Sequence, residues 1–199
     1  MKSDYISRDD LHALGEVIET APRTLRRAWL PFAVALETGL RIGDIVALPS
    51  SALTGRTLKF TAAKTGKTGS ATLSAGLCRR IKAGKNEKWL FPSPYRGGEK
   101  HLTRQAAWAR LKTAARRANL SPQGISPHSL RKVFAVELCA RQGIGAVQKA
   151  LQHSRVDVTE MYALADYLTP ENTGKPLTRG DIPMILQLAV DAVRAGIIG

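Results

Sequence analysis

Thr57-Leu58-Lys59-Phe60-Thr61-Ala62 is the stretch of sequence that decides the fold class of this chain. Polar and apolar residues alternate along it, as they do in a strand with one face against a core. The turn residues Thr65-Gly66-Lys67-Thr68-Gly69 follow, and residues 70–74 fit a returning strand. We therefore expect a small β-hairpin or a three-stranded antiparallel sheet at this point.

Helical patterns surround the hairpin on both sides. After a possible cap at Ser7, apolar residues recur at helical spacing, and a second helix is expected over about residues 24–37, with Gly39 as a left-handed cap. A short helix over residues 42–48 stops at Pro49. Further helices are expected on the C-terminal side: about residues 75–83, 103–119, from Ser126-Pro127 onward, 145–152, 156–165 and 182–198. The predicted fold class is mostly α with a small antiparallel β-sheet (α+β).

The charge of the chain indicates a polyanionic partner. The formal net charge is +14, and residues 56–120 alone hold 16 Lys and Arg against only Glu87 and Glu99. Nucleic acid is the first candidate for such a partner, and an anionic membrane surface is the second. The residues that we expect to contact DNA are Lys67, Arg79, Arg80, Arg104, Lys112 and Arg116.

The remaining composition favours a cytoplasmic protein. Cys78 and Cys139 are too few for a disulfide framework. The N-terminus has no apolar signal region, and charged residues interrupt the longest apolar stretches, so no membrane span is expected. No closely spaced histidine or carboxylate cluster suggests a metal, and no cofactor is expected.

Two arginines are placed where they could hold a phosphodiester. Arg41 lies in the segment Thr38-Gly39-Leu40-Arg41-Ile42-Gly43-Asp44, and Arg131 lies in His128-Ser129-Leu130-Arg131. A guanidinium stays charged and donates two parallel hydrogen bonds to one phosphate. His128 shares a helical face with Arg131, since the two are three residues apart.

The C-terminal half supplies a nucleophile and further proton-transfer groups. His153 can donate a hydrogen bond to phosphate or move a proton, and Tyr162 follows nine residues later. A phenol is a weak nucleophile unless cations stabilise its phenolate. Tyr167 is the rival nucleophile. Lys64, at the end of the predicted strand, could protonate a leaving oxygen, and Lys67 is the alternative for that role.

Assembled in order, these residues resemble the catalytic domain of the tyrosine recombinases, the phage integrase family. Arg41 and Asp44 match the family's first arginine segment, Lys64 its hairpin lysine, and His128 with Arg131 its H-x-x-R segment. His153 and Tyr162 match its last segment, although Gln152 stands where glycine is usual. Trp89-Leu90-Phe91-Pro92 also resembles the family's segment after the sheet.

The resemblance implies site-specific recombination of double-stranded DNA without a metal. Tyr162 would form a 3′-phosphotyrosyl link, Lys64 would act as general acid, and Asp44 would support the site. The arginines and histidines, Arg41, Arg131, His128 and His153, would hold the phosphate. A DNA-relaxing enzyme, a non-catalytic DNA-binding protein and a helix-turn-helix regulator are the alternatives.

The resemblance also divides the chain. Residues 1–169 would form the catalytic domain, and the usual N-terminal DNA-clamping domain would be missing. Residues 170–199 would be a linker and a helix that packs either on its own domain or on a neighbouring protomer. A homo-oligomer, a tetramer on DNA, is expected.

Overall fold

The computed structural model describes residues 6, 8–121, 125–142 and 144–151. The chain divides into two compact units, Met1–Arg131 and Lys132–Gly199. Helix α6 (Pro127–Gln142) begins in the first unit and continues into the second. The predicted cap at Ser7 and the predicted helices over residues 156–165 and 182–198 lie outside the described residues.

The first unit contains the predicted hairpin as part of a three-stranded antiparallel sheet. Its strands are β1 (Leu53–Thr54), β2 (Thr57–Thr61) and β3 (Thr68–Thr72), in the order β1-β2-β3. The returning strand begins earlier than predicted, because Thr68 already pairs with Thr61. Along β2 the alternation is confirmed, since Leu58 and Phe60 are buried and their neighbours are exposed.

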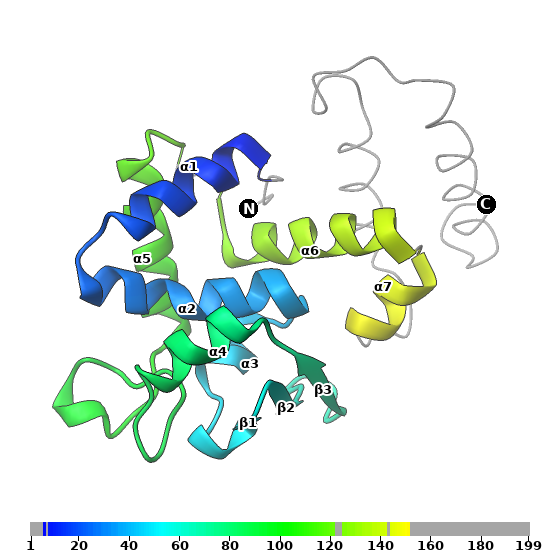
Figure 1. Cartoon of the computed structure of the whole chain (residues 1–199), viewed down its shortest axis with the longest axis horizontal. Coiled ribbons are helices and arrows are strands. Elements are labelled where there is room, and N and C mark those ends of the chain that lie inside the picture. The colour runs from blue at the N-terminus through cyan, green and yellow to red at the C-terminus, as the bar shows by residue number, and fades with distance from the viewer. Residues whose placement is uncertain (1–5, 7, 122–124, 143, 152–199) are drawn as a thin grey trace. The chain divides into compact units, whose positions relative to one another are not determined.

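Helix α2 (Arg23–Thr38) is the central element of the first unit (Figure 1). It packs against α1 (Arg8–Glu19), α3 (Ile42–Val46), α4 (Ala75–Lys82) and α5 (Arg104–Arg117). Leu30, Phe32 and Val34 are all buried, with Phe32 and Val34 fully so. The helix therefore buries much of its circumference, because neighbours cover it on several sides.

The C-terminal end of α2 is held by hydrogen bonds of the Thr38 side chain and by the left-handed conformation of Gly39. The hydroxyl of Thr38, which is buried, donates to the carbonyl of Val34 at 2.7 Å and accepts from the amide of Leu40 at 3.3 Å. Gly39 has a positive φ of 66° and donates its N–H to Ala35 at 2.8 Å. The predicted left-handed cap is thereby confirmed, and it ends the helix two residues before Arg41.

The loop between α4 and α5 is anchored from both sides. The amide of Leu90 donates to the carbonyl of Leu48 at 3.1 Å, and the amide of Leu102 donates to Phe91 at 2.8 Å. The indole of Trp89 donates to the carbonyl of Glu99 at 3.0 Å. Leu90, Phe91 and Leu102 are buried, so this proline-rich loop belongs to the packed body of the unit.

The predicted helix starts at Thr103 and Ser126 are confirmed. The hydroxyl of Thr103 accepts from the amide of Ala106 at 3.1 Å, and the hydroxyl of Ser126 accepts from the amide of His128 at 3.2 Å.

Two short 3-10 helices, η1 (Ser50–Ala52) and η2 (Arg96–Gly98), complete the first unit, and α7 (Ile144–Leu151) lies in the second. Within the described residues, no helix is both long and apolar enough to cross a membrane.

Replacement of Gly39 by alanine should destabilise the protein by about 1–2 kcal/mol, because an L-residue is strained at positive φ. The same substitution at Gly15, inside α1 and with open space around its Cα, should stabilise it by about 0.5–1 kcal/mol. Urea unfolding of both variants measures the difference. Equal effects of the two substitutions would contradict the assigned cap.

Candidate functional site

The site begins with a buried arginine bound to the end of α2. Arg131 is only 5% exposed, and its Nη1 group donates a hydrogen bond to the carbonyl oxygen of Gly39. The last carbonyls of a helix have no partner within the helix and carry partial negative charge. The end of α2 is therefore a favourable acceptor for a buried cation. This contact joins the two predicted arginine segments, which are 92 residues apart in the sequence.

Arg41 lies directly after this helix end, at the N-cap of α3. Its backbone is extended, with φ of −69° and ψ of 137°, and its carbonyl accepts from Asp44 at 2.9 Å and from Ile45 at 3.1 Å. Leu40 and Ile42 on either side are buried, whereas Arg41 is half-buried. The flanking apolar residues thus hold the backbone of Arg41 while its side chain keeps access to solvent.

Lys64 lies in the turn between β2 and β3 and is exposed, not at the end of the strand as predicted. The turn is closed by hydrogen bonds from Ala62 to Lys67 at 2.9 Å and from Gly66 to Ala62 at 2.8 Å. The Asp44 carboxylate accepts from the amide of Ala63 at 3.2 Å. Asp44 therefore ties the lysine-bearing turn to the helix that follows Arg41.

His128 lies in the first turn of α6, one turn before Arg131, and is exposed. The hydroxyls of Ser126 and Ser129 both accept backbone hydrogen bonds at the start of this helix. The amide of Ser126 donates to the hydroxyl of Ser129 at 3.1 Å, and the amide of His128 donates to the hydroxyl of Ser126 at 3.2 Å. Helix N-termini favour anions, so His128 lies where a phosphate is stabilised.

The structure thus brings together the segments that carry Arg41, Asp44, Lys64, His128 and Arg131. The predicted site residues His153 and Tyr162, and the rival Tyr167, lie outside the described residues. Among the residues that are described, no group of three His, Cys, Asp or Glu side chains is arranged to hold a metal ion.

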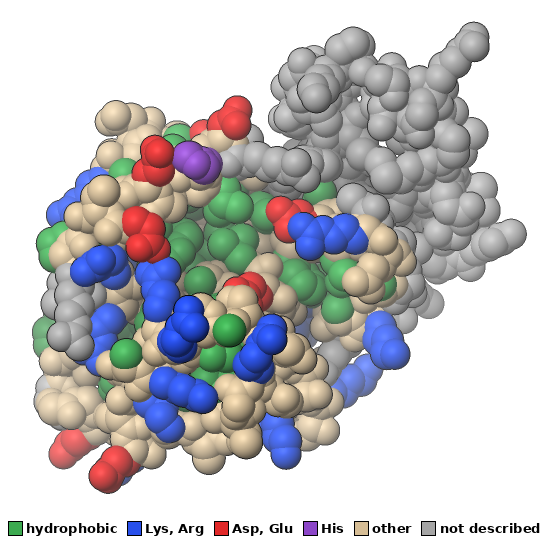
Figure 2. All heavy atoms as spheres, viewed as in Figure 1, with side chains coloured by type: hydrophobic (Ala, Val, Ile, Leu, Met, Phe, Trp, Pro, Cys, Tyr) green, Lys and Arg blue, Asp and Glu red, His purple; other side chains and the backbone are tan. Residues whose placement is uncertain are grey.

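The basic residues predicted to contact DNA lie on the hairpin turn, α4 and α5. Figure 2 shows Lys and Arg side chains gathered over the region where Figure 1 places α4 and the sheet. Arg80 pairs with Glu19 of α1 at 2.8 Å, so part of its charge is already matched. A Cβ atom added to Gly43 would lie 4.0 Å from the Arg104 side chain, which places the start of α5 beside α3. Lys67, Arg79 and Arg116 are exposed.

One exposed aromatic residue was not predicted. Trp108 on α5 is 37% exposed, and the ammonium of Lys112 lies 4.0 Å from the centre of its ring. Arg104, Trp108, Lys112 and Arg116 follow one another at intervals of four residues, so they form one stripe along α5. The sequence could have indicated this basic stripe, because α5 contains several arginines and a lysine but no acidic residue.

Comparison with known proteins identifies the family. The model of the phage integrase family matches residues 4–169. This chain belongs to the phage integrase family. The matched range includes every segment described above, and it extends through His153 and Tyr162.

Relatives of this integrase-family chain are named tyrosine recombinases. It is 37% identical over 136 residues to tyrosine recombinase XerD of Rhizobium meliloti, covering 63% of this chain and 43% of the relative. It is 30% identical over 174 residues to tyrosine recombinase XerC of Erythrobacter litoralis, covering 81% and 55% respectively. The chain therefore spans about half the length of these curated relatives.

Solved structures share the fold. The XerA recombinase matches with a TM-score of 0.67 at 18% identity, over 95% of this chain and 66% of that chain. The catalytic core of lambda integrase matches with a TM-score of 0.60 at 21% identity, over 77% of this chain and 94% of that core. The predicted fold of a tyrosine recombinase catalytic domain is confirmed.

Replacement of Asp44 by alanine should loosen the turn that carries Lys64. The lost acceptor raises the hydrogen-exchange rate of the Ala63 amide by roughly twofold to tenfold, the range expected for one partly exposed hydrogen bond. Asp44→Asn keeps an acceptor oxygen and should give a smaller increase.

The matched control is Asp9→Ala, which removes the same charge from the exposed surface of α1. NMR detection of amide exchange provides the measurement. Unchanged exchange at Ala63 in Asp44→Ala would show that the carboxylate does not hold the turn.

Proposed function

We propose that this chain cuts and rejoins double-stranded DNA as a site-specific recombinase. The observation that carries the proposal is the hydrogen bond from Arg131 to Gly39, which joins two arginine segments at the end of one helix. Membership of the phage integrase family and the recombinase names of its relatives support the same reaction.

The cations are arranged for a transferring phosphate. Arg131 is buried and oriented by a fixed carbonyl, so little side-chain freedom is lost when a phosphate binds. Arg41 and His128 lie at the starts of two helices, and both remain at least partly accessible. Together with His153, they neutralise charge on the non-bridging oxygens in the transition state.

Tyr162 is the proposed nucleophile. Its phenolic oxygen attacks the phosphorus atom, the bond to the 5′ oxygen breaks, and a 3′-phosphotyrosyl link forms. His153 assists removal of the phenol proton, and Lys64 delivers a proton to the leaving 5′ oxygen. Asp44 is a positioning residue, since it holds the turn that carries Lys64. The link conserves the energy of the broken bond, so neither a metal nor a nucleotide is required.

DNA lies across the basic residues of the hairpin turn, α4 and α5 in this proposal. The stripe of Arg104, Trp108, Lys112 and Arg116 supplies cations and one aromatic surface on the same side of α5. Phosphate contacts of this kind fix the register of a protein on the duplex.

The proposed working form is a homo-oligomer, a tetramer on DNA, in the cytoplasm. Residues 1–169 act as its catalytic domain. Residues 182–198 contain apolar positions at helical spacing, which would suit packing on a neighbouring protomer. Light scattering of the DNA complex with and without residues 178–199 distinguishes packing on a neighbour from packing on the same chain.

Wild-type protein should form a covalent adduct with a nicked suicide duplex, and Tyr162→Phe should form none. A denaturing gel detects the adduct. The matched control is Tyr167→Phe, which should retain it. An adduct that persists in Tyr162→Phe and disappears in Tyr167→Phe would assign the nucleophile to Tyr167 instead.

Substitution of Arg41 should mainly lower the rate of DNA cleavage, whereas substitution of Lys112 or Arg116 should mainly weaken DNA binding. Arg41→Ala should bind DNA nearly normally but lose at least about a hundredfold in cleavage rate, as expected when a group that stabilises transition-state charge is removed. Lys112→Ala and Arg116→Ala should weaken binding, and each should lower the slope of log affinity against log salt by about 1. Filter binding at several salt concentrations and single-turnover cleavage supply the two readouts. Equal loss of binding in all three variants would refute this division.

A further inference from the structure

A second surface of the first unit is a groove remote from the phosphate-binding cations. It has a volume of about 670 Å³ and lies among α2, α5 and the loop between α4 and α5. On α2 its lining runs from Arg27 to Pro31, and Pro31 is eight residues before Gly39, which corresponds to about 12 Å along a helix. The groove is therefore separate from the site built around Arg131.

The walls of the groove are apolar and its charges are all positive. Pro92 and Pro94 are at least partly exposed and contribute apolar surface, whereas Leu30, Pro31 and Phe91, which also line the groove, are buried. Its charged lining residues are Arg27, Lys85, Arg110 and Arg117. No carboxylate is among the described residues that line it, so the groove presents four cations beside an apolar wall.

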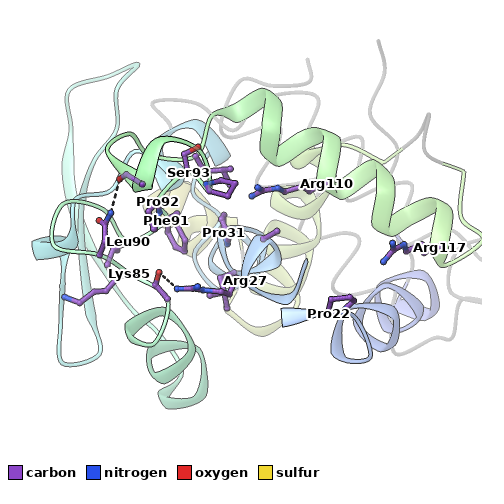
Figure 3. A pocket seen from close by; sticks show the side chains of 18 residues that line it. Pro22, Arg27, Pro31, Lys85, Leu90, Phe91, Pro92, Ser93, Arg110 and Arg117 are labelled. Carbon is purple, nitrogen blue, oxygen red and sulfur yellow. Dashed lines mark hydrogen bonds between the residues drawn. The ribbon is translucent and has the colours of Figure 1, made fainter. Parts of the chain in front are cut away.

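Two of these cations, Arg27 and Arg110, differ in how their guanidinium groups are bonded. The guanidinium of Arg27 donates to the carbonyl of Gly84 at 2.7 Å, which accounts for part of its hydrogen bonding. Arg110 is half-buried, and no hydrogen bond or ion pair joins it to another described residue. Burial lowers the pKa of the Arg110 guanidinium, and the nearby Tyr95 phenol opposes that effect. Figure 3 shows Arg110 reaching from α5 toward the loop that carries Ser93.

The groove and the proposed DNA surface occupy different sides of α5. Arg110 and Arg117 are seven residues apart and share one face, which lines the groove. Arg110 is two residues from both Trp108 and Lys112, and two residues correspond to about 200° around a helix. A duplex held by the Trp108 and Lys112 stripe would thus leave the groove side of α5 uncovered.

We propose that this groove binds an acidic segment of a partner protein, one in which aspartate or glutamate alternates with leucine or phenylalanine. The apolar side chains of that segment lie against Pro92 and Pro94, and its carboxylates pair with Arg110 and Arg117. Charge complementarity favours this occupant, because the lining supplies cations and no anion. The apolar wall favours a peptide over a nucleic-acid backbone, which has no aliphatic or phenyl groups to bury.

The test uses the whole chain and a fluorescein-labelled peptide of about twelve residues in which Glu and Asp alternate with Leu and Phe. Fluorescence anisotropy should show saturable binding. Arg110→Gln should weaken it at least about fivefold, since a hydrogen bond to a charged group is lost. Arg116→Gln, about 120° around the same helix from Arg110 and not in the lining of the groove, is the matched control and should leave peptide affinity unchanged.

Two further probes distinguish the contribution of apolar contacts to peptide binding from that of charge alone. A peptide with serine in place of every leucine and phenylalanine should bind at least about fivefold more weakly, because its apolar contacts are lost. A DNA duplex should compete poorly for the labelled peptide. Arg110→Gln should bind and cleave DNA like the wild type, and its thermal unfolding should show that it is folded.

Three results would overturn the proposal. The first is no saturable binding of the acidic peptide to the wild-type chain. The second is equal weakening of peptide binding by Arg110→Gln and Arg116→Gln, which would indicate attraction by overall charge. The third is a loss of DNA affinity in Arg110→Gln as large as that in Arg116→Gln, because the groove would then be part of the DNA surface.

Discussion

The hydrogen bond between Arg131 and the carbonyl of Gly39 is the contact on which the organisation of the site depends. A guanidinium that is 95% removed from solvent is costly unless acceptors replace its water. The end of α2 supplies an acceptor whose lone pairs are not used within the helix. The same left-handed turn that exposes this carbonyl also directs the chain into the Arg41 segment. One helix end therefore orients a buried cation and positions a second one.

Helix α2 separates two kinds of charge recognition in the first unit. Its C-terminal end meets Arg131 and leads to Arg41, whereas its N-terminal half contributes Arg27 and Pro31 to an apolar groove. On α5 the two kinds of residue lie on different sides of the helix: Trp108 and Lys112 on the proposed DNA side, and Arg110 on the groove side. A protein that is basic on so many sides can still distinguish ligands, because phosphate and acidic peptides require different surroundings for the same guanidinium group.

The sequence predicted individual helices, strands and caps, but it did not predict which residues contact one another across the fold. Alternation predicted β2, and a glycine predicted the cap of α2. The roles of Arg41 and Arg131 in a phosphate site stay a prediction. Periodicity located α2 but could not show how many neighbours surround it, and the helix is buried on several sides. The bond between Asp44 and Ala63 was equally invisible, since a backbone amide has no sequence signature. The groove arises from three distant segments, and no local pattern predicts it.

Glu37 accepts from both the amide and the hydroxyl of Ser74, at 2.8 and 2.6 Å. These two bonds close residues 37–74 into a loop at its base, and the loop contains Arg41, Asp44 and Lys64. Local opening in proteins occurs in contiguous cooperative units, and such a unit here would contain all three residues. Local opening that releases Lys64 would then release Arg41 as well. In the reaction proposed above, one local opening would therefore displace the phosphate-binding arginine and the proton donor together.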